Sequence, residues 1–519
     1  MIALAKKATR MSLWLALVLP ALPVQLAERA VEQTGPLVVI EGPAQRPVVA
    51  FCNQAAAEYG VVRGQKLAAA QALAQPLLAI ARNGELEQDT LRELAGWAYQ
   101  FSAQISPRNF LTHTISAGLL LETGGSRQLF GGHARLHRFI ERGLAALGFK
   151  AAFGYAATPQ AAWWVAAARA SGLHCPDAFE IGQLEKTLAP LPLRLTGWDA
   201  STLDALQALG LVTLGDVLAL PRDQLNRRFG TALLTDLDRA LGNLPDPQPL
   251  FTPAATFHAR LDLPADVIEI GQLMFPAHRL LRSLEGFLRG RDAGATELLF
   301  TVTHDSRRAK PVSRTAVTLA LAAPERDARR LAQLFAERLS RVQLPEPAVT
   351  LALAVDRLQP FAPQHATLLP PAPGASNLSA DTGWQQLAET LHARLGSERV
   401  FQLQAVDDHR PEHAYRMLPL VANADERRSA TPAVPQRPLL LLPRPALLDS
   451  RAETPVYAGV LRLVAGPERI ESGWWDLGSP ARRSVFRDYF VARNTHGQTL
   501  WIYRELAAPR RWFLHGFFA

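Results

Sequence analysis

The stretch that decides the fold is "SLWLALVLPALP", residues 12–23, which follows a short basic start at residues 6–10. A basic segment followed by an apolar one is typical of a secretory signal peptide. Pro20 and Pro23 would interrupt the helix of such a segment, and the run is shorter than the ~20 residues of a membrane span. A continuous apolar run is what a strand covered on both faces requires. We therefore expect residues 13–19 to form a buried strand.

The composition is that of a soluble protein with several domains. With roughly 100–200 residues per domain, the 519 residues predict about three to five domains. Cys52 and Cys175 are far apart and outside any metal-ligand spacing, so they indicate neither a disulfide framework nor a zinc site. A reducing cytoplasm is expected. An exported protein, cleaved near Ala27, stays open as an alternative, although "QLAERA" is a poor cleavage site.

Outward from the opening strand, the pattern of strands and helices changes several times. Mixed strands and helices up to about residue 185 predict an α/β or α+β domain. Residues 186–246 read as short helices joined by tight turns, and their pattern is similar to a helix-hairpin-helix module. Residues 250–360 predict the β-α-β-β-α-β order of a ferredoxin-like domain. A Pro-rich linker follows, and the aromatic last 65 residues predict a small β-rich domain.

This order, together with several stretches, resembles the Y-family translesion DNA polymerases, and within them the ImuB-type branch. The stretches are "ALVLPALP", "NQAAAEYGVVRGQKLAAAQAL", "GLLLETGGSRQLFGG", "FGYAATPQAAWWVA", "SGWWDLG", "RDYFVA" and "WFLHGFFA". The resemblance covers the chain from about residue 13 to its end. It implies a palm (11–185) with inserted fingers (about 26–85), a helix-hairpin-helix thumb (186–246), a little finger (250–360), a linker (361–383) and a C-terminal partner-binding region (384–519).

The charged residues of nucleotidyl transfer are missing from the matching positions. The two-metal mechanism needs carboxylates that hold Mg²⁺. The positions that have lost their acids are Leu17, Leu19, Ala117 and Gly118; those that have lost the triphosphate contacts are Gln54 and Ala57; and Pro159 and Trp163 stand where lysines are expected. Glu122 survives at a different position of its strand. The resemblance thus implies a protein without catalytic residues, metal or cofactor. An active lesion-bypass polymerase with displaced acids stays open.

Two regions are candidates for DNA binding. Backbone amides of a helix hairpin can hold a phosphate, and an Arg-rich sheet can follow a DNA backbone. The candidates are Gly210, Leu211 and Thr213 in the hairpin, and Arg279, Arg282, Arg289, Arg307, Arg308, Lys310 and Arg314 in the ferredoxin-like domain. The alternatives are a helical connector and an ordinary solvated face. Binding through phosphates would depend on salt and hardly on sequence.

The resemblance also implies partners. ImuB-type proteins are regarded as adaptors in DNA-damage-induced (SOS) mutagenesis that join primer–template DNA and the sliding clamp to an ImuA-type RecA-like protein and an error-prone C-family polymerase. The candidate clamp peptide contains Gln364, Leu368 and Leu369; an incidental linker sequence is the alternative. The candidate partner-binding aromatics are Trp474, Trp475, Tyr489, Phe490, Trp512 and Phe513, although aromatic residues of a small domain are more often core than interface.

Overall fold

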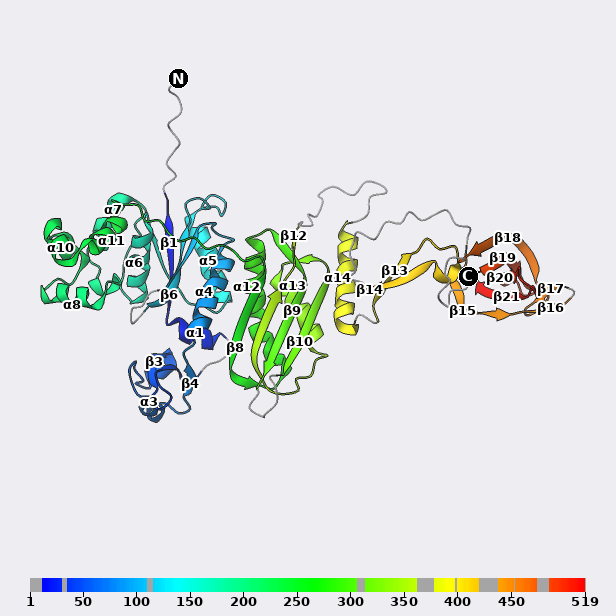
Figure 1. Cartoon of the computed structure of the whole chain (residues 1–519), viewed down its shortest axis with the longest axis horizontal. Coiled ribbons are helices and arrows are strands. Elements are labelled where there is room, and N and C mark those ends of the chain that lie inside the picture. Colours follow the sequence, from blue (N-terminus) through cyan, green and yellow to red (C-terminus); the bar gives the residue numbers. More distant parts are fainter. Residues whose placement is uncertain are drawn as a thin grey trace, which may run out of the picture. The chain divides into compact units, whose positions relative to one another are not determined.

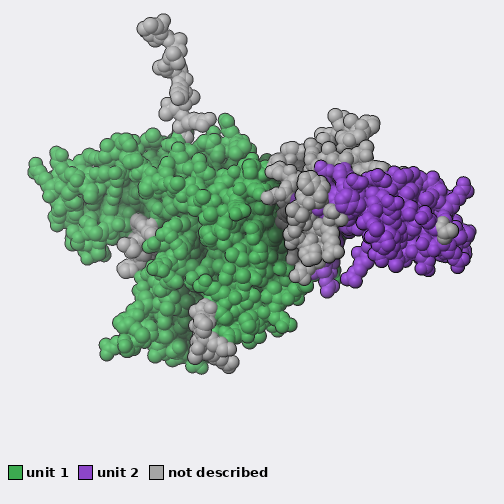
Figure 2. All heavy atoms as spheres, turned by 45° about the vertical axis from the view of Figure 1, so that its right-hand side comes forward, with its two compact units in different colours: residues 1–394 green, residues 395–519 purple. Residues whose placement is uncertain are grey.

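The computed structural model describes residues 12–29, 35–109, 115–305, 313–361, 378–396, 399–419, 437–451, 453–473 and 485–518 (Figure 1). The clamp candidates Gln364, Leu368 and Leu369, the basic candidates Arg307, Arg308 and Lys310, and the aromatic candidates Trp474 and Trp475 lie outside these residues. Contacts divide the chain into two compact units, residues 1–394 and 395–519 (Figure 2).

The opening stretch forms β1 (Trp14–Pro20), which confirms the predicted strand. β1 pairs antiparallel with β6 (Ile115–Glu122) and β7 (Ala152–Ala156), and β5 (Ile105–Asn109) completes the sheet order β5-β6-β1-β7. Even-numbered residues of β1 pack toward α6 (Pro159–Ala170), and odd-numbered residues pack toward α4 (Gly84–Ala98) and α5 (His133–Ala146) (Figure 1). Helices on both faces explain why residues 15–19 are apolar without alternation and at most 1% exposed.

A small module is inserted after β1. It contains α1 (Leu22–Glu28), β2 (Leu37–Glu41), β3 (Val48–Cys52), α2 (Gln54–Glu58), α3 (Leu67–Leu73) and β4 (Leu78–Ala81). Its sheet has the order β3-β2-β4, with β4 parallel to β2. α4 ends at Ala98.

A helical region follows α6 and packs on it. It contains α7 (Ile181–Leu188), η1 (Leu193–Leu195), α8 (Ala200–Ala208), α9 (Leu214–Leu218), α10 (Arg222–Phe229) and α11 (Thr231–Leu241). Gly210 turns the chain between α8 and α9 with φ of 81°, in the left-handed region that favours glycine. The predicted helix–turn–helix arrangement is therefore present.

The next region has the predicted β-α-β-β-α-β order. Its elements are β8 (Phe257–Val267), η2 (Ile270–Leu273), α12 (Met274–Arg289), β9 (Ala293–His304), β10 (Arg314–Glu325), α13 (Ala328–Leu339), β11 (Ala348–Val355) and β12 (Leu358–Pro360). The sheet order is β10-β9-β11-β8, and neighbouring strands are antiparallel. The helices α12 and α13 pack against one face of this sheet and form the core with it (Figure 1). α14 (Leu378–Leu395) begins inside the predicted linker, residues 361–383.

The second unit is rich in strands, as predicted. Its elements are β13 (Phe401–Ala405), η3 (Pro411–His413), β14 (Tyr415–Pro419), β15 (Leu440–Leu447), β16 (Asp449–Arg451), β17 (Thr454–Val456), β18 (Arg462–Ser472), β19 (Val485–Arg493), β20 (Thr499–Glu505) and β21 (Trp512–Phe517). Five of them form the sheet β15-β21-β20-β19-β18. The α+β multidomain fold class is thus confirmed. None of the helices among the described residues combines the length and the apolar character that a membrane crossing requires.

Candidate functional site

The positions predicted to have lost metal ligands lie on both faces of the first sheet. Leu19 is paired with Ala117, and both belong to the core against α4 and α5, as does Leu17. Gly118 is paired with Val18, which belongs to the core against α6. A shift of one residue moves a side chain to the opposite face. The β1 residue beside Gly118 is therefore Val18, and none of the predicted positions Leu17, Leu19, Ala117 and Gly118 carries an acid on either face.

Trp163 fills the space over Gly118. The Trp163 side chain is fully buried. A Cβ atom at Gly118 would lie 2.1 Å from the backbone oxygen of Leu17 and 2.9 Å from Cη2 of Trp163. Such separations are too short for any side chain, so a carboxylate cannot be placed at this position. The centre is a packed apolar core around an indole ring.

Arg108 lies at the edge of this core. Its guanidinium carbon is 5.7 Å from the centroid of the Trp163 ring. It donates hydrogen bonds to Oε1 of Gln160 at 3.0 Å and to Oε1 of Gln248 at 3.1 Å. Burial lowers the pKa of Arg108, and Asp246 and Asp236 act in the opposite direction. This cation therefore joins β5, α6 and the segment after α11.

Glu122, the surviving acid, has a structural role. Its carboxylate accepts hydrogen bonds from the backbone N–H groups of Leu13 (3.3 Å), Gly124 (2.9 Å) and Gly125 (3.2 Å). It therefore fixes the turn after β6. Within the described ranges, no three His, Cys, Asp or Glu side chains are grouped so that they could hold a metal ion.

The positions predicted to have lost triphosphate contacts are exposed and uncharged. Gln54 and Ala57 lie on α2, and Nε2 of Gln54 donates to Oε1 of Glu58 at 3.2 Å. Pro159 begins α6, where its missing N–H is harmless. α2 itself carries no cation that could hold a phosphate.

The hairpin amides are already bonded inside the chain. The carboxylate of Asp216 accepts from the backbone N–H of Val212 at 2.9 Å and of Thr213 at 2.8 Å. The N–H groups of Gly210 and Leu211 bond back to the carbonyl oxygens of Gln207 and Leu206. These hydrogen bonds hold the pKa of Asp216 below its usual value, so it stays an anion. The prediction that this hairpin offers its amides to a phosphate is therefore corrected. The Thr-x-x-Asp spacing of a capping box was the sequence signal.

Most of the predicted basic DNA contacts on the described residues have partners. Arg279 lies 4.4 Å from the Phe275 ring centroid and donates to the carbonyl oxygen of Glu28 at 3.4 Å. Arg282 and Arg289 both pair with Glu285, at 3.0 and 2.6 Å. All three lie on α12, which packs against the helix face of the sheet. Arg314 is exposed on the face of β10 that points away from α12 and α13.

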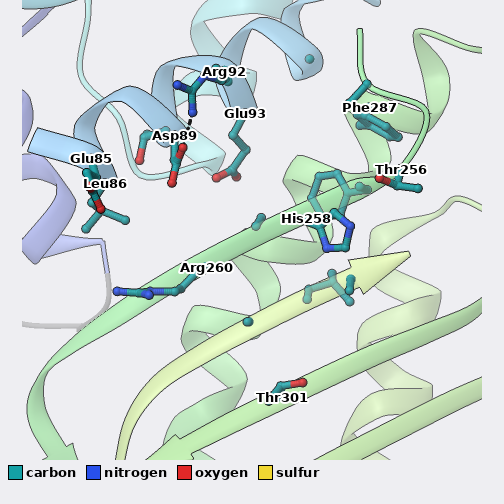
Figure 3. A pocket seen from close by; sticks show the side chains of 18 of the residues that line it. Glu85, Leu86, Asp89, Arg92, Glu93, Thr256, His258, Arg260, Phe287 and Thr301 are labelled. Atoms are coloured by element: carbon teal, nitrogen blue, oxygen red, sulfur yellow. Dashed lines mark hydrogen bonds and ion pairs between the residues drawn. The ribbon is translucent and has the colours of Figure 1, made fainter. Parts of the chain in front are cut away.

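The acidic face of α4 lies opposite part of the sheet that contains β8, on the sheet face away from α12 and α13. Glu85, Asp89 and Glu93 are four residues apart along α4, and with His258 and Arg260 of β8 they line a hollow of about 550 Å³ (Figure 3). Asp89 pairs with Arg92, and Arg260 pairs with Asp262 at 2.8 Å. Glu93 lies within 4.0 Å of Arg29, so the charges on this side of the hollow are largely paired.

The chain is similar in sequence to known proteins. Residues 22–167 match the impB/mucB/samB family. The chain is 29% identical over 483 residues to Protein ImuB of Caulobacter vibrioides, in strain NA1000 / CB15N and in strain ATCC 19089 alike, covering 88% of this chain and 100% of the relative. The resemblance to ImuB-type, Y-family-like proteins is confirmed.

Solved structures are also similar. One is the crystal structure of DinB from Sulfolobus solfataricus, with 14% identity, a TM-score of 0.37 and coverage of 66% of this chain and 98% of the other. Another is an insertion ternary complex of Dbh DNA polymerase, with 15% identity, a TM-score of 0.38 and coverage of 67% and 99%. The family match and the ImuB similarity support a role related to DNA-damage mutagenesis.

The predicted partner-binding aromatics on the described residues are mainly core. Tyr489 and Trp512 are buried, at 1% and 7% exposure, and Phe490 and Phe513 are half-buried against the same clusters. Exposed apolar side chains instead occur on the β13–β14 ribbon, where Leu403 faces Met417 across the strands. Those on the ribbon are Phe401, Leu403, Tyr415 and Met417, between 45% and 64% exposed. The alternation in "FQLQA" was the available sequence signal.

Proposed function

We propose that this chain is a non-catalytic, Y-family-like adaptor in DNA-damage-induced mutagenesis, acting in the cytoplasm. The observation that carries the proposal is the packing of Trp163 over Gly118, which leaves no room for a carboxylate beside β1. Without acids to hold two Mg²⁺ ions, phosphoryl transfer cannot be stabilised by metals. The role of Glu122 as a turn cap supports the same conclusion.

The proposed partners are primer–template DNA, the sliding clamp, an ImuA-type RecA-like protein and an error-prone C-family polymerase. Clamp contact is assigned to Gln364, Leu368 and Leu369. DNA contact is assigned to the basic segment with Arg307, Arg308 and Lys310 and to the neighbouring Arg314, because the hairpin amides and the arginines of α12 are engaged. Protein partners are assigned to the β13–β14 ribbon instead of the buried aromatics, since exposed apolar faces mark interaction sites.

Primer extension tests the absence of catalysis. The purified protein is mixed with a labelled primer–template, Mg²⁺ and all four nucleotides, and DNA binding is measured in the same tube. We expect binding that weakens steeply with salt and no extension. An active Y-family polymerase on the same template is the positive control. Extension that persists after further purification would instead support the lesion-bypass polymerase.

The ribbon predicts a second result. Replacing Leu403 and Met417 by Glu should lower the affinity for the ImuA-type protein or the C-family polymerase at least about tenfold, because burying one such side chain contributes about 1.5–3 kcal/mol. Both side chains are exposed, so unfolding should change by only about 0.5 kcal/mol. Gln402→Glu, on the other ribbon face, is the matched control. Unchanged capture of both partners by the double variant would remove the ribbon from the proposal.

A further inference from the structure

A groove between α5 and α12 includes, on its α12 side, Arg282 and Arg289, two of the predicted DNA contacts. It has a volume of about 610 Å³ and is lined by residues of α4, α5 and α12 and of the turn before α5. Its floor is a row of rings. Trp97 and Phe101 are 5.2 Å apart, Phe101 and Phe130 are 5.6 Å apart, and Phe130 and Phe139 are 6.1 Å apart between centroids. The row rises from buried Trp97 to Phe139, which is 43% exposed.

The Trp97 end of the floor is tightly packed because two glycines let α5 and α12 approach the indole closely. A Cβ atom on Gly143 of α5 would lie 2.4 Å from Cζ2 of Trp97, and one on Gly286 of α12 would lie 2.1 Å from its Cδ1. The indole is thus held between two helices that come from distant parts of the sequence. A groove formed in advance loses less entropy on binding than one that must be ordered.

Four arginines surround this apolar floor: Arg135, Arg142, Arg282 and Arg289. Glu285, whose side chain is only 9% exposed, bonds to both Arg282 and Arg289 and so fixes their positions. Arg135 and Arg142 are exposed on α5 and form no ion pair with any residue that the structure describes. Glu285 is the single carboxylate among the lining residues, so the groove has a strong positive excess.

We propose that this groove binds an acidic peptide segment of a partner protein, with one large apolar side chain on the aromatic floor and carboxylates on the arginines. Arg–carboxylate pairs are bidentate and charge-assisted, which suits the exposed Arg135 and Arg142. The groove mouth includes Leu129, which is 82% exposed and aliphatic.

An apolar anchor explains this mouth better than a nucleic acid does. A strand of DNA would need phosphate contacts in a row along the strand. Here the cations surround a single hollow, and the mouth carries an aliphatic side chain. The surface is distinct from the β13–β14 ribbon and does not depend on the adaptor role.

The test uses the full chain and a fluorescein-labelled peptide in which Glu residues surround a Leu-Phe pair (EEELFEEE). Fluorescence anisotropy measures its affinity, beside a peptide with Lys in place of Glu (KKKLFKKK) and a labelled oligothymidylate. We expect the acidic peptide to bind and the Lys peptide not to bind, and we expect any binding of the oligothymidylate to be the same in the parent chain and in the groove variants. Arg135→Glu combined with Arg142→Glu should weaken it at least about tenfold, the effect of losing one charge-assisted hydrogen bond of about 1.5–3 kcal/mol. Arg138→Glu is the matched control on the same helix, outside the groove.

Phe139→Ala adds a readout for the apolar anchor and should weaken binding several-fold. Equal losses in the Arg138→Glu control and in the double variant would overturn the proposal, because they would show a general charge effect. Absence of binding by the acidic peptide would overturn it as well. Binding of the oligothymidylate that the double variant abolishes would assign the groove to nucleic acid instead.

Discussion

Trp163→Ala is expected to lower the free energy of unfolding of the first unit by about 3–5 kcal/mol, the range for removing a large buried aromatic side chain. The Trp163 ring is fully buried between α6 and β6, where it fills the space over Gly118. Its loss would leave a cavity that the surrounding alanine-rich helix cannot fill. Urea unfolding followed by circular dichroism measures the change. Tyr59→Ala, at an exposed aromatic residue, is the control and should change it by about 0.5 kcal/mol or less.

The same core predicts that restored acids will not restore catalysis. A chain with Val18→Asp, Gly118→Asp and Trp163→Ala should be strongly destabilised, because unpaired carboxylates would enter an apolar core. It should extend no primer with Mg²⁺. If Trp163→Ala unfolds like the parent chain, the indole is not the packing element described above. Extension by the triple variant would show that the centre is a polymerase site blocked only by side chains.

The strand in the opening stretch could be predicted because an unbroken apolar run needs cover on both faces, and α6 on one side with α4 and α5 on the other provide it. Which β1 residue lies beside Gly118 could not be predicted, since a single-residue offset changes the face but not the hydrophobicity. The register of β1 with β6 decides this point in favour of Val18.

The candidate DNA contacts show a second limit. Arginine content indicated a phosphate-binding surface, yet Arg282 and Arg289 are three and four residues from Glu285 on one helix, a spacing at which opposite charges pair. Thr213 and Asp216 likewise have capping-box spacing. These local pairs could therefore be predicted from the sequence. The aromatic floor from Trp97 to Phe139 could not be predicted, because it depends on how α12 packs against α4 and α5.

The second large effect is a loss of stability of the C-terminal unit in acid. His515 is buried, its Nδ1 lies 2.8 Å from the hydroxyl of Tyr489, and its ring stacks on Trp501. Burial lowers the pKa of His515 to about 4, with Glu412 acting against this shift and Arg487 adding to it. The unfolded chain, with an ordinary histidine pKa of about 6.5, binds a proton that the folded unit does not. Stability is therefore retained above about pH 6.5 and falls as the pH drops toward 4.

Partial solvent screening reduces the expected loss to about 2 kcal/mol between pH 7 and pH 4. Pulse proteolysis in urea, read on a C-terminal tag, measures the stability of this unit within the full chain. His515→Phe keeps an aromatic ring against Trp501 and removes the titrating group, so it should flatten the pH dependence. His496→Phe, at an exposed histidine, is the control and should leave the slope unchanged. If the free energy of unfolding depends on pH equally in His515→Phe and in the parent chain, groups other than His515 cause the acid sensitivity, because the variant has no imidazole to titrate.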